Sequence, residues 1–129
     1  MEYWECFEWE KEYKYGKLKF EGEYKNGKRN GKGKEYYSDF KLEFDGEYIN
    51  GVRWNGKGKQ YNYVGELEFE GEYINGERNG KGKEYDLDSG NLLFEGNYLN
   101  GKRNGKGKEY HNGDLIYEGE FVNGDKKII

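Results

Sequence analysis

Residues 20–36 read FEGEYKNGKRNGKGKEY, and this stretch decides the fold because the chain repeats it. Close copies begin at Phe44, Phe69 and Phe94, and a shortened copy begins at Tyr117, so the starts lie 23 to 25 residues apart. A fixed period of this length is typical of repeat proteins, in which each unit packs against its neighbours. We predict a single repeat domain over 1–129, with a capping strand and half repeat at 1–19, repeats at 20–43, 44–68, 69–93 and 94–116, and a partial repeat at 117–129.

Each copy predicts one β-hairpin. In residues 20–24, rings and glycine alternate with carboxylates, and a period of two is that of a strand. Asn-Gly pairs follow at 26–27 and 30–31, and Asn-Gly supplies the positive φ that a tight reversal between strands requires. Residues 33–36 then form the returning strand. We therefore expect an all-β fold, an elongated, twisted antiparallel sheet of stacked hairpins.

A glycine recurs between the two rings of every copy. Glycine weakens a strand unless another group must approach its backbone closely. We predict that aromatic side chains fold over these bare positions and form a continuous ladder along the stack. The glycines are Gly22, Gly46, Gly71, Gly96 and Gly119, and the ring pairs are Phe20/Tyr24, Phe44/Tyr48, Phe69/Tyr73, Phe94/Tyr98 and Tyr117/Phe121.

The composition supports a folded chain with an unusual core. Of the 129 residues, 33% are hydrophobic and 37% charged, but aromatic residues reach 19%, which argues against disorder. The net charge of -4 argues against generic nucleic-acid binding. Cys6 is the single cysteine, so no internal disulfide can form. The sequence has no apolar run long enough to predict a membrane span or a signal peptide. We expect a cytoplasmic protein, associated with a membrane or the cytoskeleton through its partners.

These patterns resemble the MORN (membrane occupation and recognition nexus) repeat. The resemblance extends from Phe20 to Gly124, and its specificity lies in a spacing of four glycines that recurs four times, first at Gly22, Gly27, Gly31 and Gly33. It implies a rod or half-pipe of hairpins that acts as a scaffold or binding module. The partners that it implies are protein segments, a second copy of the same protein, and acidic phospholipids.

The two ends of the array differ. At the N-terminus, Glu8 and Glu10 stand where the repeats have glycine, so we predict a capping strand at 2–15. Its alternate residues are expected to supply the rings that close the ladder: Tyr3, Phe7, Trp9 and Tyr13. The C-terminus shows no comparable cap, and an exposed strand edge there predicts pairing with a second copy into a homodimer.

Candidate partner-binding residues follow the repeat. An apolar stripe at Ile49, Ile74 and Leu99, continued by Val122, is expected opposite the tyrosine ladder, where it either packs beneath the loops or forms a groove for a partner peptide. We place the centre of partner contact at this stripe or at Tyr48, Tyr73 and Tyr98. Trp54 is an extra residue in a loop of the second repeat, either folded back on its hairpin or serving as an interface anchor.

The arginines are the candidates for an anionic ligand. Arg29, Arg53, Arg78 and Arg103 share one register and predict a basic edge along the stack. This edge is either a solvated surface with cross-strand Glu-Lys pairs or a site for a lipid headgroup or acidic peptide.

No constellation predicts catalysis. His111 and Cys6 stand alone, so neither a nucleophile with its base nor a zinc site can be assembled, and we expect no cofactor. Residues 86–91 predict a turn rather than a calcium loop. The preferred function is a non-enzymatic scaffold or protein-interaction module that binds a partner segment along the sheet. The alternatives are a peripheral membrane adaptor binding acidic phospholipids through basic loops, and an engineered consensus repeat protein without a ligand.

Overall fold

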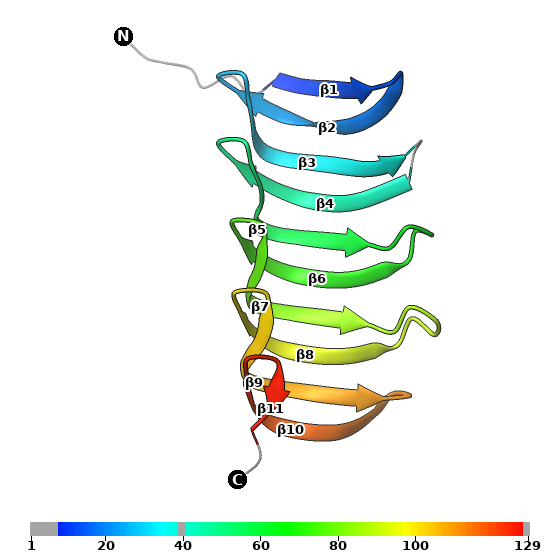
Figure 1. The fold of residues 1–129 in the computed structure, drawn as a ribbon, viewed down its shortest axis with the longest axis vertical. Helices are drawn as coiled ribbons and strands as arrows, with labels where there is room; N and C mark the ends of the chain where they lie inside the picture. The colour runs from blue at the N-terminus through cyan, green and yellow to red at the C-terminus, as the bar shows by residue number, and fades with distance from the viewer. Residues whose placement is uncertain (1–7, 39–40, 128–129) are drawn as a thin grey trace.

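The residues that the structure describes form one antiparallel sheet of 11 strands (Figure 1). The computed structural model describes residues 8–38 and 41–127, apart from the side chains of Arg53 and Trp54. The strands pair strictly in chain order, so the prediction of stacked hairpins is confirmed. They are β1 (Glu8–Lys14), β2 (Lys17–Lys25), β3 (Lys28–Ser38), β4 (Lys41–Ile49), β5 (Val52–Tyr61), β6 (Leu67–Ile74), β7 (Glu77–Tyr85), β8 (Leu92–Leu99), β9 (Lys102–His111), β10 (Asp114–Val122) and β11 (Asp125–Lys126).

The hairpin loops use the first Asn-Gly pair of each repeat. Asn26 has a φ of 52° and Gly27 a φ of 76°, the left-handed geometry of a tight reversal. Three of these loops also rest on the hairpin before them, as where the N–H of Gly51 donates to the carbonyl of Arg29 at 2.8 Å. The second pair lies in β3 instead of the loop, where residues 30–32 oppose Glu23 alone and form a β-bulge.

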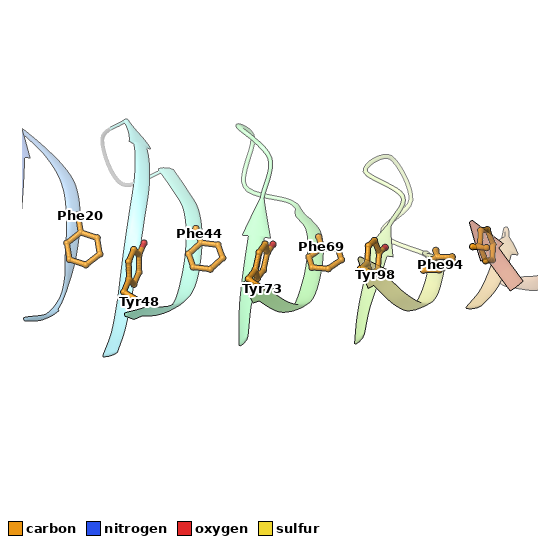
Figure 2. Packing of buried hydrophobic residues seen from close by; sticks show 8 residues of the cluster. Phe20, Phe44, Tyr48, Phe69, Tyr73, Phe94 and Tyr98 are labelled. Carbon is orange, nitrogen blue, oxygen red and sulfur yellow. The ribbon is translucent and has the colours of Figure 1, made fainter. Parts of the chain in front are cut away.

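The core is a single file of rings along one face of the sheet, which we call the ring face (Figure 2). Phe20, Phe44, Phe69 and Phe94 are fully buried. Rings of successive hairpins meet edge to face, as Phe20 and Tyr48 do with centroids 5.0 Å apart. This geometry is the favourable one for aromatic pairs, worth about 0.5 to 1.5 kcal/mol each beyond burial.

The glycines are required by these rings. A Cβ on Gly33 would lie 2.6 Å from the ring of Phe20, and a Cβ on Gly22 would lie 2.6 Å from the Cα of Gly33. Both separations are far below van der Waals contact, so only glycine fits. The prediction that rings fold over bare backbone is therefore confirmed.

The N-terminal strand caps the sheet with carboxylates and not with rings. β1 pairs with β2 so that Glu10 lies opposite Gly22 and Glu12 opposite Phe20. Trp9 pairs with Glu23 and therefore projects from the face opposite the rings, where it is 52% exposed. Tyr13 is 62% exposed, so the expectation that these two rings close the ladder is wrong. Tyr3 and Phe7 lie outside the described residues.

At the other end, β11 covers little of β10. The pair is limited to Phe121 opposite Lys126 and Val122 opposite Asp125. The last ring of the array, Tyr117, lies over Gly119 and donates its hydroxyl to the carbonyl of Glu120 at 3.0 Å.

Candidate partner-binding face

The tyrosines predicted as partner contacts belong to the core. Tyr48, Tyr73 and Tyr98 are 1%, 2% and 4% exposed, because their rings are needed to cover the glycines. Their hydroxyls point inward to acceptors on the preceding hairpin: Tyr48 donates to Glu35 at 2.9 Å, Tyr73 donates to Gln60 at 3.0 Å, and Tyr98 donates to Glu84. Placing them at the centre of a docking surface was therefore wrong.

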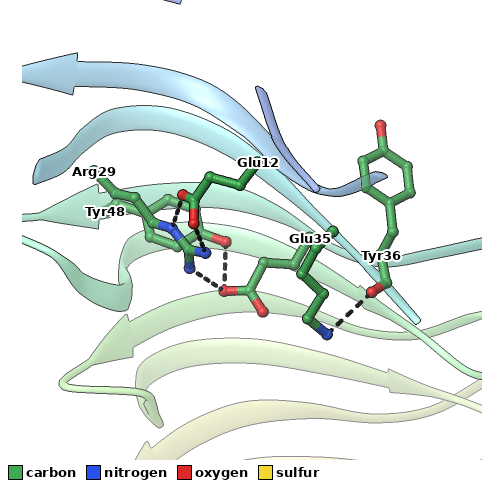
Figure 3. A network of polar contacts seen from close by, with 6 residues as sticks. Glu12, Arg29, Glu35, Tyr36 and Tyr48 are labelled. Carbon is green, nitrogen blue, oxygen red and sulfur yellow. Dashed lines mark hydrogen bonds and ion pairs between the residues drawn. The ribbon is translucent and has the colours of Figure 1, made fainter. Parts of the chain in front are cut away.

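The arginines also serve the ring face (Figure 3). The guanidinium of Arg29 lies 4.0 Å from the centroid of Phe20, its Nε donates to Glu12 at 2.8 Å, and its Nη1 donates to Glu35 at 3.3 Å. Burial by itself would lower the pKa of Arg29, but the hydrogen bond and charge of Glu12 more than offset it, so the pKa is raised. This cation is therefore committed to covering a ring.

The same arrangement recurs along the stack. Arg103 lies 4.2 Å from the centroid of Phe94 and donates to Glu84 at 2.8 Å and to Glu109 at 3.3 Å. Burial would raise the pKa of Glu84, but the hydrogen bonds from Arg103 and Tyr98 lower it below its usual value. In the third repeat, the guanidinium of Arg78 lies 4.0 Å from the centroid of the Phe69 ring and donates to a neutral side chain, Gln60, at 3.4 Å. These three arginines form no basic edge, and the side chain of Arg53 lies outside the described residues.

The opposite face of the sheet carries a long groove of about 1130 Å³, and we call this side the groove face. Its floor is the backbone of the core glycines in β5 to β10, and charged residues flank the floor on both sides. The row nearer the turns between successive hairpins, which we call the turn-side row, consists of Asp45, Lys59, Glu70, Lys83, Glu95, Lys108 and Glu118. The row nearer the Asn-Gly hairpin loops, which we call the loop-side row, consists of Lys57, Glu72, Lys81, Asn97, Lys106 and Glu120.

Lysines and carboxylates oppose one another across the strands, so charge alternates along the turn-side row and, except at Asn97, along the loop-side row. Lys59 faces Glu70, and Lys83 faces Glu95. The groove walls hold six lysines and six carboxylates and so have no net charge. Such pairs between exposed side chains contribute little stability, about 0 to 1 kcal/mol each. The groove therefore presents charges that remain open to exchange with a partner.

The apolar stripe borders this groove. Ile49, Ile74 and Leu99 are 50%, 51% and 49% exposed. On their strands, these residues lie two positions after Glu47, Glu72 and Asn97, respectively. Side chains two residues apart on a strand share a face, so the stripe projects from the groove face. Val122 continues the stripe and is 49% exposed. Trp54 lies in β5 and not in a loop, because the extra residue of the second repeat enlarges the bulge opposite Glu47; its side chain lies outside the described residues.

Two polar features of the groove face were missed by sequence reasoning. Carboxylates of the loop-side position enter the bulges, where Glu23 accepts from the N–H of Lys32 at 2.9 Å and Glu72 accepts from the N–H of Lys81 at 2.8 Å. A tyrosine of the returning strand also donates to the hairpin's leading strand. These bonds are Tyr36 to Glu21 at 3.1 Å, Tyr85 to Glu70 at 2.5 Å and Tyr110 to Glu95 at 2.8 Å. The second Asn-Gly pair of each repeat was the available signal for the bulge.

The described residues offer no arrangement for metal chemistry. Within 8–38 and 41–127, no group of three or more His, Cys, Asp or Glu side chains could hold an ion. His111 is exposed at the end of β9, beside Asn112 of the following turn. Over the same ranges, no helix has the length and apolar character needed to cross a bilayer.

Comparison with known proteins agrees with the geometry. The family model of the MORN repeat matches residues 20–40, 69–88, 94–115 and 117–126, more than half of the chain. Residues 41–68, which the family model does not match, contain the second repeat, and this repeat also forms a hairpin of the same sheet. No curated protein shows significant similarity to the chain.

Proposed function

Because the chain belongs to the MORN repeat family, whose repeats generally serve as protein- or lipid-interaction modules, we propose that it binds a protein partner along the groove face. The observation that carries this proposal is the neutral groove of about 1130 Å³ beside an exposed apolar stripe. The family is typically non-enzymatic, which suits a face made of repeated charges and aliphatic side chains.

The dimensions of the groove suit an extended polypeptide segment. Neighbouring strands lie about 4.8 Å apart, so equivalent groups recur about every 10 Å along the stack. Three residues of an extended chain span the same distance, at about 3.3 Å each. Because side chains of an extended segment alternate in direction, every sixth residue meets an equivalent group from the same side, two repeats further along the groove. Aliphatic side chains of the partner would contact Ile74 and Leu99, while its polar groups would exchange with the lysine and carboxylate rows.

The charges favour a polypeptide over an acidic membrane surface. Arg29, Arg78 and Arg103 are occupied on the ring face, and the lysines of the groove are balanced by carboxylates. Membrane adsorption relies on an excess of cations and weakens steeply with salt. Sedimentation with phosphatidylserine vesicles at rising salt tests this alternative, and salt-sensitive binding at submicromolar affinity would favour the membrane adaptor.

The stripe provides the direct test of the proposal. We expect Ile74→Asp and Leu99→Asp to abolish capture of the partner from a lysate of the source organism. The matched control is Val64→Asp, since Val64 is 72% exposed but lies outside the stripe. Hydrogen exchange on the reconstituted pair should then show protection of β6 and β8. Partner binding unchanged by both stripe variants, with circular dichroism showing intact folds, would exclude the groove face.

Strand β10 supports a second proposal, that two copies associate. Among the described residues, β10 pairs with β9 along its length but with β11 only at Phe121 and Val122. Leu115 and Ile116 on this strand are 51% and 55% exposed. An open edge with apolar side chains tends to pair with another edge, and a two-fold dimer closes it. Analytical ultracentrifugation should show a concentration-dependent dimer that Ile116→Lys weakens; a monomer at every concentration would contradict this.

A further inference from the structure

We infer that the bulge of the fourth hairpin, at residues 104–106, is a binding site for a carboxylate of the partner. This inference rests on the proposed function, because the bulge opens into the groove. It assigns the partner a chemical feature: an Asp or Glu side chain that seats opposite Asn97.

The other hairpins show what such a bulge holds. In the first and third repeats, the bulge is occupied by a carboxylate of the same chain: Oε1 of Glu23 accepts from the N–H of Lys32 at 2.9 Å, and Oε2 of Glu72 accepts from the N–H of Lys81 at 2.8 Å. In the second repeat, the carboxylate of Glu47 lies against Gly56, the bulge glycine. Three of the four bulges thus contain a carboxylate supplied from the opposing strand.

The fourth bulge has the same backbone but lacks that carboxylate. Gly105 has a φ of 96° and the equivalent Gly80 a φ of 97°, so the two bulges share one geometry. The opposing residue is Asn97, which is one methylene shorter than Glu and uncharged. Its nearest approach to a Cβ built on Gly105 is 3.5 Å, and among the hydrogen bonds of the described residues it makes none to the N–H of Lys106. Turn-like backbone with its N–H groups turned to one side is a recurrent anion site.

The charges around Asn97 favour the same ligand. Lys81 lies directly opposite Asn97 on β7, and Lys106 lies on β9 across the bulge. Both lysines are exposed, whereas the preceding two lysines of the loop-side row, Lys57 and Lys81, are separated by Glu72. The row therefore has three lysines against two glutamates, an excess that is concentrated at this position.

Position in the groove adds a second requirement for the partner. Leu99 follows Asn97 by two residues on β8, so the stripe passes about 7 Å from the bulge. A partner segment whose carboxylate enters the bulge places a neighbouring side chain over Leu99. The segment expected to bind best is acidic with aliphatic residues, and a polypeptide supplies both groups from one chain.

A pair of reciprocal variants tests the site with hexaglutamate as the probe and hexaglutamine as its neutral control. Chemical shifts of the wild-type amides should change at Gly105 and Lys106 and saturate at one peptide per chain. We expect Asn97→Glu to weaken this binding about ten-fold or more, because it fills the bulge from within. Glu72→Asn should create a second site, with new shifts at Lys81 and two peptides bound per chain.

The outcomes separate this inference from the proposed function. Equal affinity in wild type and Asn97→Glu, or shifts confined to the hairpin-loop lysines, would overturn the carboxylate site. Protection of Lys106 by phosphatidylserine vesicles without any response to hexaglutamate would assign the anion to a membrane and would also overturn it. If Asn97→Glu leaves partner capture intact while Ile74→Asp abolishes it, the carboxylate site is wrong and the proposed function stands. If neither variant changes partner capture, both the carboxylate site and the proposed function are wrong.

Discussion

The two faces of this sheet use the same repeat for opposite purposes. On the ring face, the aromatic side chains are 0 to 4% exposed at the core positions, and Arg29 and Arg103 close over them with their charges paired to glutamates. On the groove face, lysines and carboxylates alternate in the open, and the aliphatic stripe is about half exposed. A single-layer sheet has no second layer to bury its core. One face must therefore supply both the core and its cover, which leaves the charged and aliphatic side chains of the other face exposed.

The largest contrast between the faces is expected at adjacent residues. In Gly71→Val, the new Cβ would lie 2.5 Å from the carbonyl oxygen of Lys81 and 2.6 Å from the Cα of Gly82, so the strands must separate. We expect a loss of about 3 kcal/mol or more in the free energy of unfolding. Glu72→Val removes one hydrogen bond and should cost about 1 kcal/mol. Urea denaturation measures both, and equal midpoints would contradict the ring-over-glycine packing.

A smaller contrast is expected between cations of the two faces. Arg103→Met removes the ion pairs of Arg103 with Glu84 and Glu109 on the ring face, and we expect a loss of about 2 kcal/mol in the free energy of unfolding. Lys108→Met removes a groove-face ion pair to Glu118 at 3.5 Å and should cost less than about 0.5 kcal/mol. Thermal unfolding of the two variants side by side checks the ranking, which a larger loss in Lys108→Met would reverse.

The second repeat offers a way to strengthen the ring face. Gln60 stands where the other repeats have glutamate, and it accepts from Tyr73 at 3.0 Å and from Arg78 at 3.4 Å. In Gln60→Glu, both hydrogen bonds become charge-assisted, so we expect a gain of about 1 kcal/mol at neutral pH. Gln60→Met is the control and should lose stability. Destabilisation by both changes would show that the network tolerates no further charge there.

The smallest expected effect is a pH dependence on the groove face. Burial, followed by the hydrogen bond to Glu70, raises the pKa of Tyr85 to about 12. An unfolded tyrosine ionises near pH 10. Between about pH 10 and about pH 12, the unfolded chain releases this proton and the folded chain retains it, so stability falls as the pH rises. We expect Tyr85→Phe to flatten part of this fall in denaturation series at rising pH, and an unchanged slope would count against the bond to Glu70.

The period of the sequence was sufficient to predict the hairpins and the packing of rings over glycine, because a strand glycine between two rings leaves bare backbone that the rings can cover. The sequence pattern predicted the wrong structure where one pattern is compatible with two structures. In β1, alternation places either Trp9 or Glu10 on the ring face, and a register change of one residue reverses every side chain. Asn30-Gly31 suits a loop or a bulge, since both need positive φ. The arginines share a register, but only the folded structure shows that they turn back over phenylalanine.

The glutamates of β1 also determine how the array can lengthen. A hairpin placed ahead of β1 would lay its phenylalanine where Glu10 projects, at a position equivalent to Gly33, whose Cβ would lie 2.6 Å from such a ring. Growth by duplication is therefore excluded at that junction. Within 20–116, by contrast, an inserted hairpin meets glycines on both sides and extends the sheet without changing its ends. The number of hairpins can therefore increase within 20–116 but not ahead of β1.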